Sequence, residues 1–259
     1  MIKKHLAILG AIVVLPAFAQ VSIAPRFNAP IRGRVEHGDG TTTAGNWSGY
    51  AVTGSDFTKA EGSWIVPAMT CKTGTEYAVF WVGIDGYEPT SKTVEQTGTE
   101  AVCSGATATY SAWYEFCCTE PIITIPSMTV KPGDTMSASI SYSASTGKFT
   151  VKITDERSGQ TFSKSAAVSG AQRSSAEWIA EAPSDGEILP LADFGTVLFG
   201  KDSTSIAGTN NAKDSSTHGP ISSFSTIEEI TMEKSGIKEA IPSALSSDGS
   251  SFSVTWAAK

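Results

Sequence analysis

Short segments in which apolar and polar residues alternate follow one another from about residue 46 to residue 256. Alternation with a period of two is typical of β-strands that bury one face. Turn-forming residues separate the segments, as at 131–134, 145–148 and 157–160. No long stretch has a helical period. The pattern therefore predicts strands over 49–54, 60–68, 77–86, 106–116, 135–145, 148–156, 176–183, 225–233 and 251–256.

The order of these segments also predicts how the chain folds. Residues 130–165 contain three strand patterns joined by tight turns, which predicts a three-stranded meander. Many short strands at regular spacing favour an all-β sandwich of two antiparallel sheets. Because no linker sequence follows residue 46, residues 46–259 are predicted to form one domain, a size that single sandwiches reach.

The first 45 residues have a different character. Two lysines at positions 3 and 4 precede an apolar run over 6–18, and small residues at 17 and 19 offer a cleavage site before Gln20. Residues 1–19 are therefore predicted to be a signal peptide, with an uncleaved anchor as the alternative. The protein is expected to be exported, secreted or periplasmic, and free of the membrane afterwards. Residues 20–45 lack periodicity and predict a flexible arm or a short propeptide.

Charge narrows the possible partners. The formal net charge is −7, and the first 44 residues hold five of the 19 basic residues but only two of the 26 acidic ones. The predicted domain is thus more acidic than the whole chain. Nucleic acid is an unsuitable partner, because phosphate binding needs a basic patch. An acidic domain with few basic groups is compatible with work at low pH.

Four cysteines suggest disulfides in an exported chain. Four allow three complete pairings. Cys117 and Cys118 are not expected to pair with each other, because adjacent residues on a strand point to opposite faces. Zinc is the alternative use of cysteine, but the spacing fits no zinc pattern. We therefore expect no metal.

Histidine is scarce, at positions 5, 37 and 218 only. His5 lies in the predicted signal peptide and His37 in the arm, so His218 alone remains in the domain. Hydrolases with a Ser-His-Asp or Cys-His arrangement need a positioned imidazole. No phosphate-binding or dinucleotide-binding glycine motif is present either. The sequence therefore disfavours these classes and predicts no cofactor.

Carboxylates are the remaining chemical groups. Asp85, Glu115, Glu177 and Glu181 stand among aromatic and apolar residues. A period of two places Glu177 and Glu181 on one strand face and Trp178 on the other, toward the core. A solvated edge is the simpler interpretation of such a pair of acids. The tryptophans near each acid favour a cleft, where loss of water raises a carboxyl pKa.

Six sequence blocks resemble those of the glutamic peptidases, also called eqolisins, in the same order and at similar spacing. Each block alone is a weak signal, but several in order make a strong one, and the resemblance extends from about residue 46 to residue 256. Cysteine placement and the short arm differ from fungal members and resemble a bacterial type. The blocks are "NWSGYAV" at 46–52, "FWVGIDG" at 80–86, "VEQTGTE" at 94–100, "YSAWYEF" at 110–116, "GQTFSKS" at 159–165 and "AEWIAEAP" at 176–183.

The resemblance implies a concanavalin-like sandwich of two curved antiparallel sheets with a concave substrate cleft. It also implies a catalytic pair, Gln96 and Glu181. Glu181 would act as general base and acid on a water molecule, while Gln96 orients the water and stabilises the oxyanion. The residues implied to bind substrate or support the site are Trp47, Trp81, Asp85 and Glu115.

An exported acid endopeptidase, monomeric and acting on protein or peptide substrates, is the function that these features favour. Two other classes remain open. A concave sandwich with tryptophans could be a carbohydrate-binding module. A glycosidase could use two carboxylates, such as Glu115 and Glu181. Neither alternative accounts for the glutamine block that accompanies the others.

Overall fold

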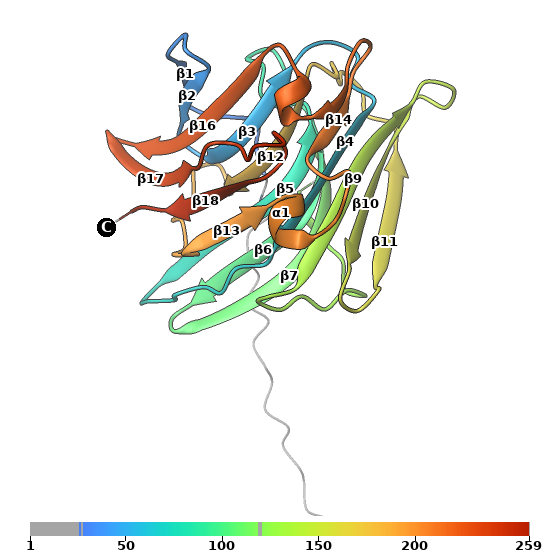
Figure 1. The fold of residues 1–259 in the computed structure, drawn as a ribbon. Helices are drawn as coiled ribbons and strands as arrows, with labels where there is room; N and C mark the ends of the chain where they lie inside the picture. Colours follow the sequence, from blue (N-terminus) through green and yellow to red (C-terminus); the bar gives the residue numbers. More distant parts are fainter. Residues whose placement is uncertain (1–25, 27, 119–120, 259) are drawn as a thin grey trace, which may run out of the picture.

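The computed structural model describes residue 26, residues 28–118 and residues 121–258, and the chain is almost entirely β (Figure 1). The predicted signal peptide lies outside the described residues. In the described part, the only helices are α1 (Lys201–Thr204) and a 3-10 turn, η1 (Ile221–Ser223). None of the helices described there is long and apolar enough to cross a membrane.

One sheet carries the sequence blocks at 46–52, 80–86, 94–100, 110–116 and 176–183. Its antiparallel strands follow in the order β8 (Ile123–Thr124), β7 (Thr107–Cys117), β6 (Val94–Ser104), β5 (Thr75–Ile84), β12 (Ser175–Glu181), β3 (Trp47–Thr53) and β16 (Ile227–Lys234). β2 (Thr41–Ala44) pairs with β16 in parallel, and β1 (Val35–Glu36) pairs with β2.

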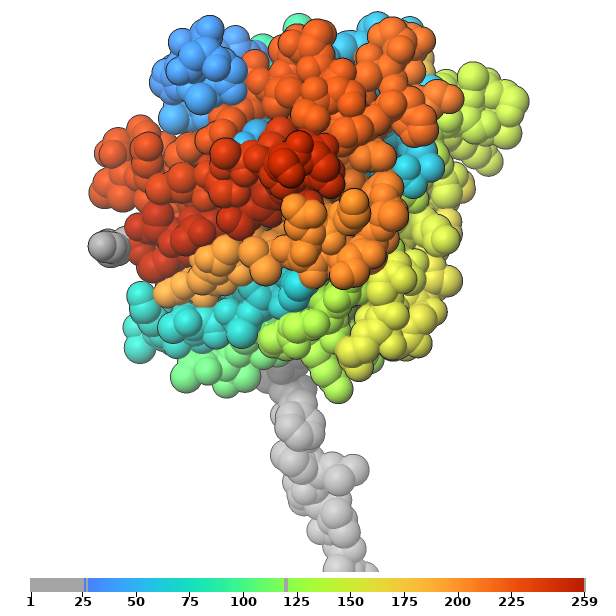
Figure 2. Space-filling view, viewed as in Figure 1, coloured from blue at the N-terminus to red at the C-terminus, as the bar shows by residue number. Residues whose placement is uncertain are grey.

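The other sheet contains the predicted meander, which is confirmed. Its order is β11 (Thr161–Ala166), β10 (Lys148–Asp155), β9 (Thr135–Ser143) and β4 (Lys59–Ile65), and the far side of β4 pairs with β13 (Thr196–Phe199) and β14 (Asn211–Lys213). These continue into β18 (Phe252–Trp256) and β15 (His218–Pro220). β17 (Ile237–Pro242) pairs with both β16 and β18 and so links the two sheets. Figure 2 shows the C-terminal strands, in orange and red, spread across the viewed face.

The main core lies between the sheets, where apolar side chains of β4, β9 and β10 meet those of β5 and β12. Two indoles bond across it. The Trp178 Nε1–H donates to the carbonyl oxygen of Glu61 at 2.7 Å, and the Trp64 Nε1–H donates to Thr99 Oγ1 at 2.9 Å. Buried indoles need such a partner for their N–H groups. The predicted core position of Trp178 is confirmed, with no exposed surface.

A second apolar cluster covers the opposite face of the first sheet. It includes Trp47, Trp81, Trp113 and Ile179. Strand alternation sends the side chains of β12 that do not enter the main core to this face. The candidate functional residues lie among them.

The cysteines pair as Cys71–Cys103 and Cys117–Cys118. The expectation that Cys117 and Cys118 would not pair with each other is wrong. It assumed that both lie on one strand, where successive side chains diverge. β7 ends at Cys117, so Cys118 lies beyond the strand and the alternation does not apply to it.

Candidate active site

Gln96 and Glu115 form the centre of the site. They are directly opposed on β6 and β7, and both are fully buried. Gln96 Nε2–H donates to Glu115 Oε2 at 2.9 Å and to the main-chain oxygen of Asn28 at 2.8 Å. Gln96 Oε1 is buried and has no hydrogen-bond partner within the described residues. The amide group is therefore fixed through its nitrogen, and its oxygen is left as an available acceptor.

Glu181 lies at the end of β12 and is also fully buried. The Trp81 Nε1–H donates to Glu181 Oε2 at 2.8 Å, and Asn46 Nδ2–H donates to Glu181 Oε1 at 3.4 Å. Both donors come from neighbouring parts of the sheet, since β12 pairs with β5 on one side and with β3 on the other. One carboxylate oxygen is thus held by an indole and the other by an amide.

Burial raises the pKa of Glu181 well above that of an ordinary glutamate, and the nearby charge of Glu115 raises it further. Hydrogen bonds from Trp81 and its neighbours oppose this rise. Burial raises the pKa of Glu115 in the same way, against the hydrogen bonds from Asn28 and Gln96. Two carboxyl groups that interact in a dry site resist losing both protons. While the site is buried, at least one of Glu181 and Glu115 is therefore expected to keep its proton.

Trp47 and Trp81 form the wall beside Glu181. Their rings meet edge to face, with centroids 5.0 Å apart and planes at 76°. The ring of Trp81 lies over Gly83, where an added Cβ would come within 2.6 Å of it. Only glycine leaves room for the indole at this point, so the strand positions the donor to Glu181 by lacking a side chain.

Asp85 binds the loop that precedes β12 rather than the candidate pair. Its carboxylate accepts hydrogen bonds from the main-chain N–H groups of Gln172, Arg173 and Ser174, each at 2.8 Å. These residues form the loop that leads into β12. Asp85 thus fixes the entry of the strand that carries Glu181, and its described hydrogen bonds reach neither Gln96 nor Glu181.

Glu177 lies in a different environment from Glu181, although both are fully buried on the same face of β12. The simpler interpretation, a solvated edge, is therefore wrong for this pair. Burial raises the pKa of Glu177, and the charges of Asp85 and Glu95 add to the rise. The charge that acts on Glu181 is that of Glu115, the hydrogen-bond partner of Gln96. Of the two acids, Glu181 is the one whose pKa is raised by the acid bonded to Gln96, although no hydrogen bond found between described residues joins Glu181 to Gln96 itself.

The histidines of the described chain lie elsewhere. His218 is exposed on β15 of the second sheet, and His37 is exposed between β1 and β2. No hydrogen bond found between described residues joins either imidazole to Gln96 or Glu181. The chemistry of this site must therefore come from carboxyl and amide groups.

Sequence reasoning did not single out two contributors to the site. Asn46 stands in the "NWSGYAV" block and donates to Glu181, but only Trp47 of that block was expected to matter. The main chain of residues 28–30 bonds to Gln96, Asn46 and Trp47. Nearly every residue type carries the same main-chain N–H and C=O groups. The amino-acid sequence of the arm therefore could not predict this contact.

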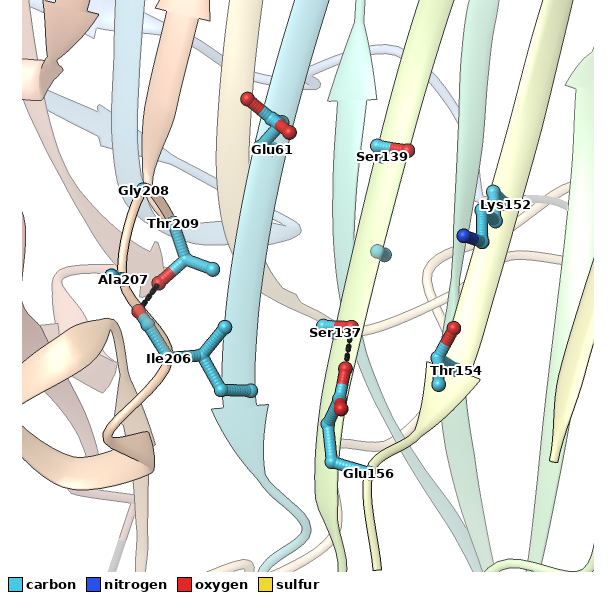
Figure 3. A pocket seen from close by; sticks show the side chains of 11 residues that line it. Glu61, Ser137, Ser139, Lys152, Thr154, Glu156, Ile206, Ala207, Gly208 and Thr209 are labelled. Atoms are coloured by element: carbon cyan, nitrogen blue, oxygen red, sulfur yellow. Dashed lines mark hydrogen bonds between the residues drawn. The ribbon is translucent and has the colours of Figure 1, made fainter. Parts of the chain in front are cut away.

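Two of the hollows on the described chain differ in how they lie relative to the candidate site. One, of about 370 Å³, lies on the outer surface of β4, β9 and β10, and it is lined by serines, threonines, Lys152 and two glutamates (Figure 3). None of the six predicted site residues lines it. The other, of about 380 Å³, is bounded by Ala29, Pro30, Arg32 and Cys118 together with 184–186. It adjoins the segment that bonds to Gln96, and so borders the candidate site.

Comparison with known families gives a match over nearly the whole domain. The model of the peptidase A4 family matches residues 45–256. Aspergillopepsin-2 of Aspergillus niger is 28% identical over 243 residues, which cover 84% of this chain and 80% of that protein. Scytalidopepsin B of Scytalidium lignicola is 30% identical over 163 residues, which cover 59% of this chain and 60% of that protein.

Solved structures show the same fold. Scytalido-glutamic peptidase, crystallised with a transition state analog inhibitor, superposes with a TM-score of 0.66 at 24% identity, covering 82% of this chain and 98% of that chain. Aspergilloglutamic peptidase from Aspergillus niger gives a TM-score of 0.57 at 24% identity, covering 70% and 99%. The predicted all-β sandwich is confirmed.

Proposed function

This chain belongs to the peptidase A4 family, the glutamic peptidases, and from this we propose that it is an exported acid endopeptidase that uses Glu181 and Gln96. Glu181 takes a proton from water as the water attacks the carbonyl carbon of a peptide bond. It then returns the proton to the leaving amine. Gln96 orients the water through its amide oxygen and stabilises the oxyanion through its amide N–H.

The observation that carries this proposal is the hydrogen bonding of Gln96. Its Nε2 already donates to a peptide carbonyl oxygen, that of Asn28, at 2.8 Å. An oxyanion donor must lie about this far from the position that the oxyanion will occupy. Its Oε1 is unpaired among the described residues and can accept a hydrogen bond from water. One amide thus has both groups that the mechanism needs.

Burial raises the pKa of Glu181 above its ordinary value, so the carboxyl group keeps its proton at acidic pH while the site is covered. A general base works best when its pKa lies near the working pH. Water that enters with substrate reduces the burial and lowers the pKa of Glu181 toward the acidic range, in which the carboxylate can accept a proton. The N–H groups of Trp81 and Asn46 keep the carboxylate in place while its charge changes.

Substitution of Glu181 tests the assignment against a matched control. Glu181→Gln keeps the shape but cannot carry the proton, and it should reduce cleavage of denatured protein at acidic pH by at least about a hundredfold, the usual scale of general acid–base catalysis. Glu177→Gln changes an equally buried acid on the same strand face and should remain active. Peptide release measured from pH 2 to 7, roughly around ordinary carboxyl pKa values, distinguishes them. An active Glu181→Gln protein would overturn the assignment.

Gln96→Ala tests the second member of the pair. It removes both the donor and the acceptor of the amide, so kcat should fall by at least about a hundredfold, as for loss of one oxyanion donor. A glycosidase that used Glu115 and Glu181 would tolerate this change. Release of sugar from polysaccharide by the Gln96→Ala protein would favour that alternative.

Export is proposed on the sequence of residues 1–19. The mature protein should be found outside the cytoplasm with an N-terminus at Gln20 or later. Mass spectrometry of the protein from each cell fraction measures both properties. Intact Met1 on the exported protein would contradict cleavage.

A further inference from the structure

The outer face of the second sheet carries a hollow that the proposed peptidase chemistry does not use. Its volume is about 370 Å³, within the range of roughly 300–1,000 Å³ that small-molecule sites occupy. β4, β9 and β10 form its floor, and the loop over 206–209 that leads to β14 forms its wall (Figure 3). Gln96 and Glu181 lie on strands of the first sheet, so a ligand in this hollow leaves them free.

A row of three polar side chains crosses the floor of the hollow (Figure 3). Ser139 lies directly opposite Glu61 of β4 on one side and Lys152 of β10 on the other. Directly opposed residues share a face of the sheet, and neighbouring strands are about 4.8 Å apart. Ser137 and Thr154 form the next opposed pair along the same strands. The floor therefore presents a carboxylate, hydroxyl groups and an ammonium group at short, regular spacings.

Two groups of this row are free to bond to a ligand. Neither the hydroxyl group of Ser139 nor the ammonium group of Lys152 makes a hydrogen bond or ion pair with a described residue. The carboxylates are partly engaged, since Glu61 Oε1 pairs with Lys59 Nζ at 2.8 Å and Glu156 accepts a hydrogen bond from a neighbouring serine. Two lysines and two glutamates balance in charge. The hollow therefore favours a neutral ligand over an anion or a cation.

The wall of the hollow is held in place by hydrogen bonds from behind. Thr209 Oγ1–H donates to the carbonyl oxygen of Ile206 at 2.9 Å, and Ser63 Oγ–H donates to Thr209 Oγ1 at 2.8 Å. The N–H of Ile206 donates to Thr204 Oγ1 at 3.3 Å. A ligand thus meets a preformed wall and does not have to order it. The half-buried side chain of Ile206 gives this wall an apolar surface beside the polar floor.

The chemistry of the hollow fits a sugar better than a peptide. A peptide binds a sheet through main-chain groups at a free edge. The main-chain groups of β9, at the middle of the floor, are already used in pairing with β4 and β10. A sugar ring instead has hydroxyl groups around its edge, which donate and accept hydrogen bonds with side chains, and C–H groups on its faces, which pack against aliphatic side chains.

We propose that this hollow binds a neutral oligosaccharide. Glu61, Ser139 and Lys152 bond to its hydroxyl groups, and Ile206 packs against the C–H face of a ring. The sugar chain belongs either to a polysaccharide or to the glycan of a protein, since both offer the same hydroxyl groups. Bound sugar holds the protein on material that carries peptide substrates, while the candidate active site on the other sheet stays open. This binding function does not depend on the proposed roles of Gln96 and Glu181.

Calorimetric titration of the full chain with cellotriose, maltotriose and mannotriose tests the site. At least one of these probes should bind with a Kd of about 1 mM or lower. Mannotriose represents the glycan of a protein and the two glucose trisaccharides represent polysaccharides, so the preferred probe identifies the source. A neutral glycine–serine peptide and trigalacturonate should bind at least about tenfold more weakly. The Glu181→Gln protein should bind the preferred probe as the parent does, so failure of the peptidase assignment would leave this result intact.

Substitutions on the floor should weaken binding, and matched substitutions beside it should not. Ser139→Leu removes the hydroxyl group and fills the centre of the floor, and Lys152→Met removes the ammonium group from an exposed side chain. Each should raise the Kd of the preferred trisaccharide at least about tenfold. Ser141→Leu and Lys148→Met make the same changes on the same strands and the same outer face, outside the hollow, and should keep the parent Kd.

Three results would overturn the site. The first is the absence of binding heat with all three trisaccharides. The second is an equal Kd in the parent, Ser139→Leu and Lys152→Met proteins, or equal weakening by Ser139→Leu and Ser141→Leu. The third is tighter binding of the glycine–serine peptide than of every sugar, which would make the hollow a peptide site. If circular dichroism shows that Ser139→Leu does not fold, Lys152→Met and Lys148→Met decide the question, because both lysines are exposed.

Discussion

At the scale of single residues, neighbours decide what each glutamate can do. Glu181 and Glu177 share a strand, a face and complete burial. Glu181 receives N–H donors from Trp81 and Asn46, whereas the carboxylate of Glu177 makes no hydrogen bond among the described residues. Glu181 therefore has the support that a proton carrier needs, and Glu177 makes folding depend on pH.

Glu177→Gln should make the protein less sensitive to neutral pH. Burial raises the pKa of Glu177 in the folded state, so the folded protein holds this proton more tightly than the unfolded chain. The resulting stability is present below the ordinary pKa of roughly 4.5 and is lost as the pH rises from there through the raised value. At pH 7, the glutamine variant should therefore lose less stability relative to pH 3 than the parent protein does.

Urea unfolding at pH 3 and pH 7 measures this difference. Glu187→Gln removes an exposed carboxyl group and should leave the pH dependence unchanged. The same loss of stability in the Glu177→Gln and parent proteins would show that Glu177 does not carry it.

At the scale of elements, β5 positions the donor to Glu181 through its side-chain pattern. Trp81 and Gly83 point to the same face, and the missing side chain of Gly83 accommodates the indole. β12 lies directly beside this strand, with Ile179 opposite Trp81. The contact therefore needs the glycine, the tryptophan and the register together.

Gly83→Ala should displace the indole and weaken its hydrogen bond to Glu181. The methyl group would meet the ring at 2.6 Å, so the expected cost is roughly 1–3 kcal/mol of stability, with at least a tenfold loss of kcat/KM. Trp81→Phe removes the N–H group directly. The double variant should lose little more activity than Trp81→Phe alone, because both changes act on one contact. Fully additive losses in kcat/KM would contradict this coupling.

Sequence reasoning found some of the strands and missed others. All nine predicted strands are present. The predicted set omits β1, β8, β14 and β15, which have only two or three residues each, too few to show an alternation, but it also omits the longer β2, β6, β13 and β17, among which β6 carries Gln96. Such short strands form against neighbours that are already in place, as β8 does along β7 and β14 along β4.

At the scale of the whole molecule, two sheets, the arm and the disulfides form one unit. The Cys71–Cys103 bond ties the loop before β5 to the end of β6, and β17 joins the sheets. Replacement of both cysteines by serine should lower the free energy of unfolding by roughly 3–4 kcal/mol, the loop-closure value for 32 residues of separation. Denaturant unfolding measures this loss, and an unchanged unfolding midpoint would show that the bond adds nothing.

The sequence by itself determined the β class, nine of the strands, the scarcity of histidine and the family, whose resemblance implies the candidate pair. A period of two and the family blocks carry that information locally. Only the tertiary structure decided that Glu115 is the acid bonded to Gln96, how the cysteines pair and where the described part of the arm lies. These depend on register between strands and on main-chain contacts across long separations. Alternation defines the face on which a side chain lies, but not the residue that it meets there.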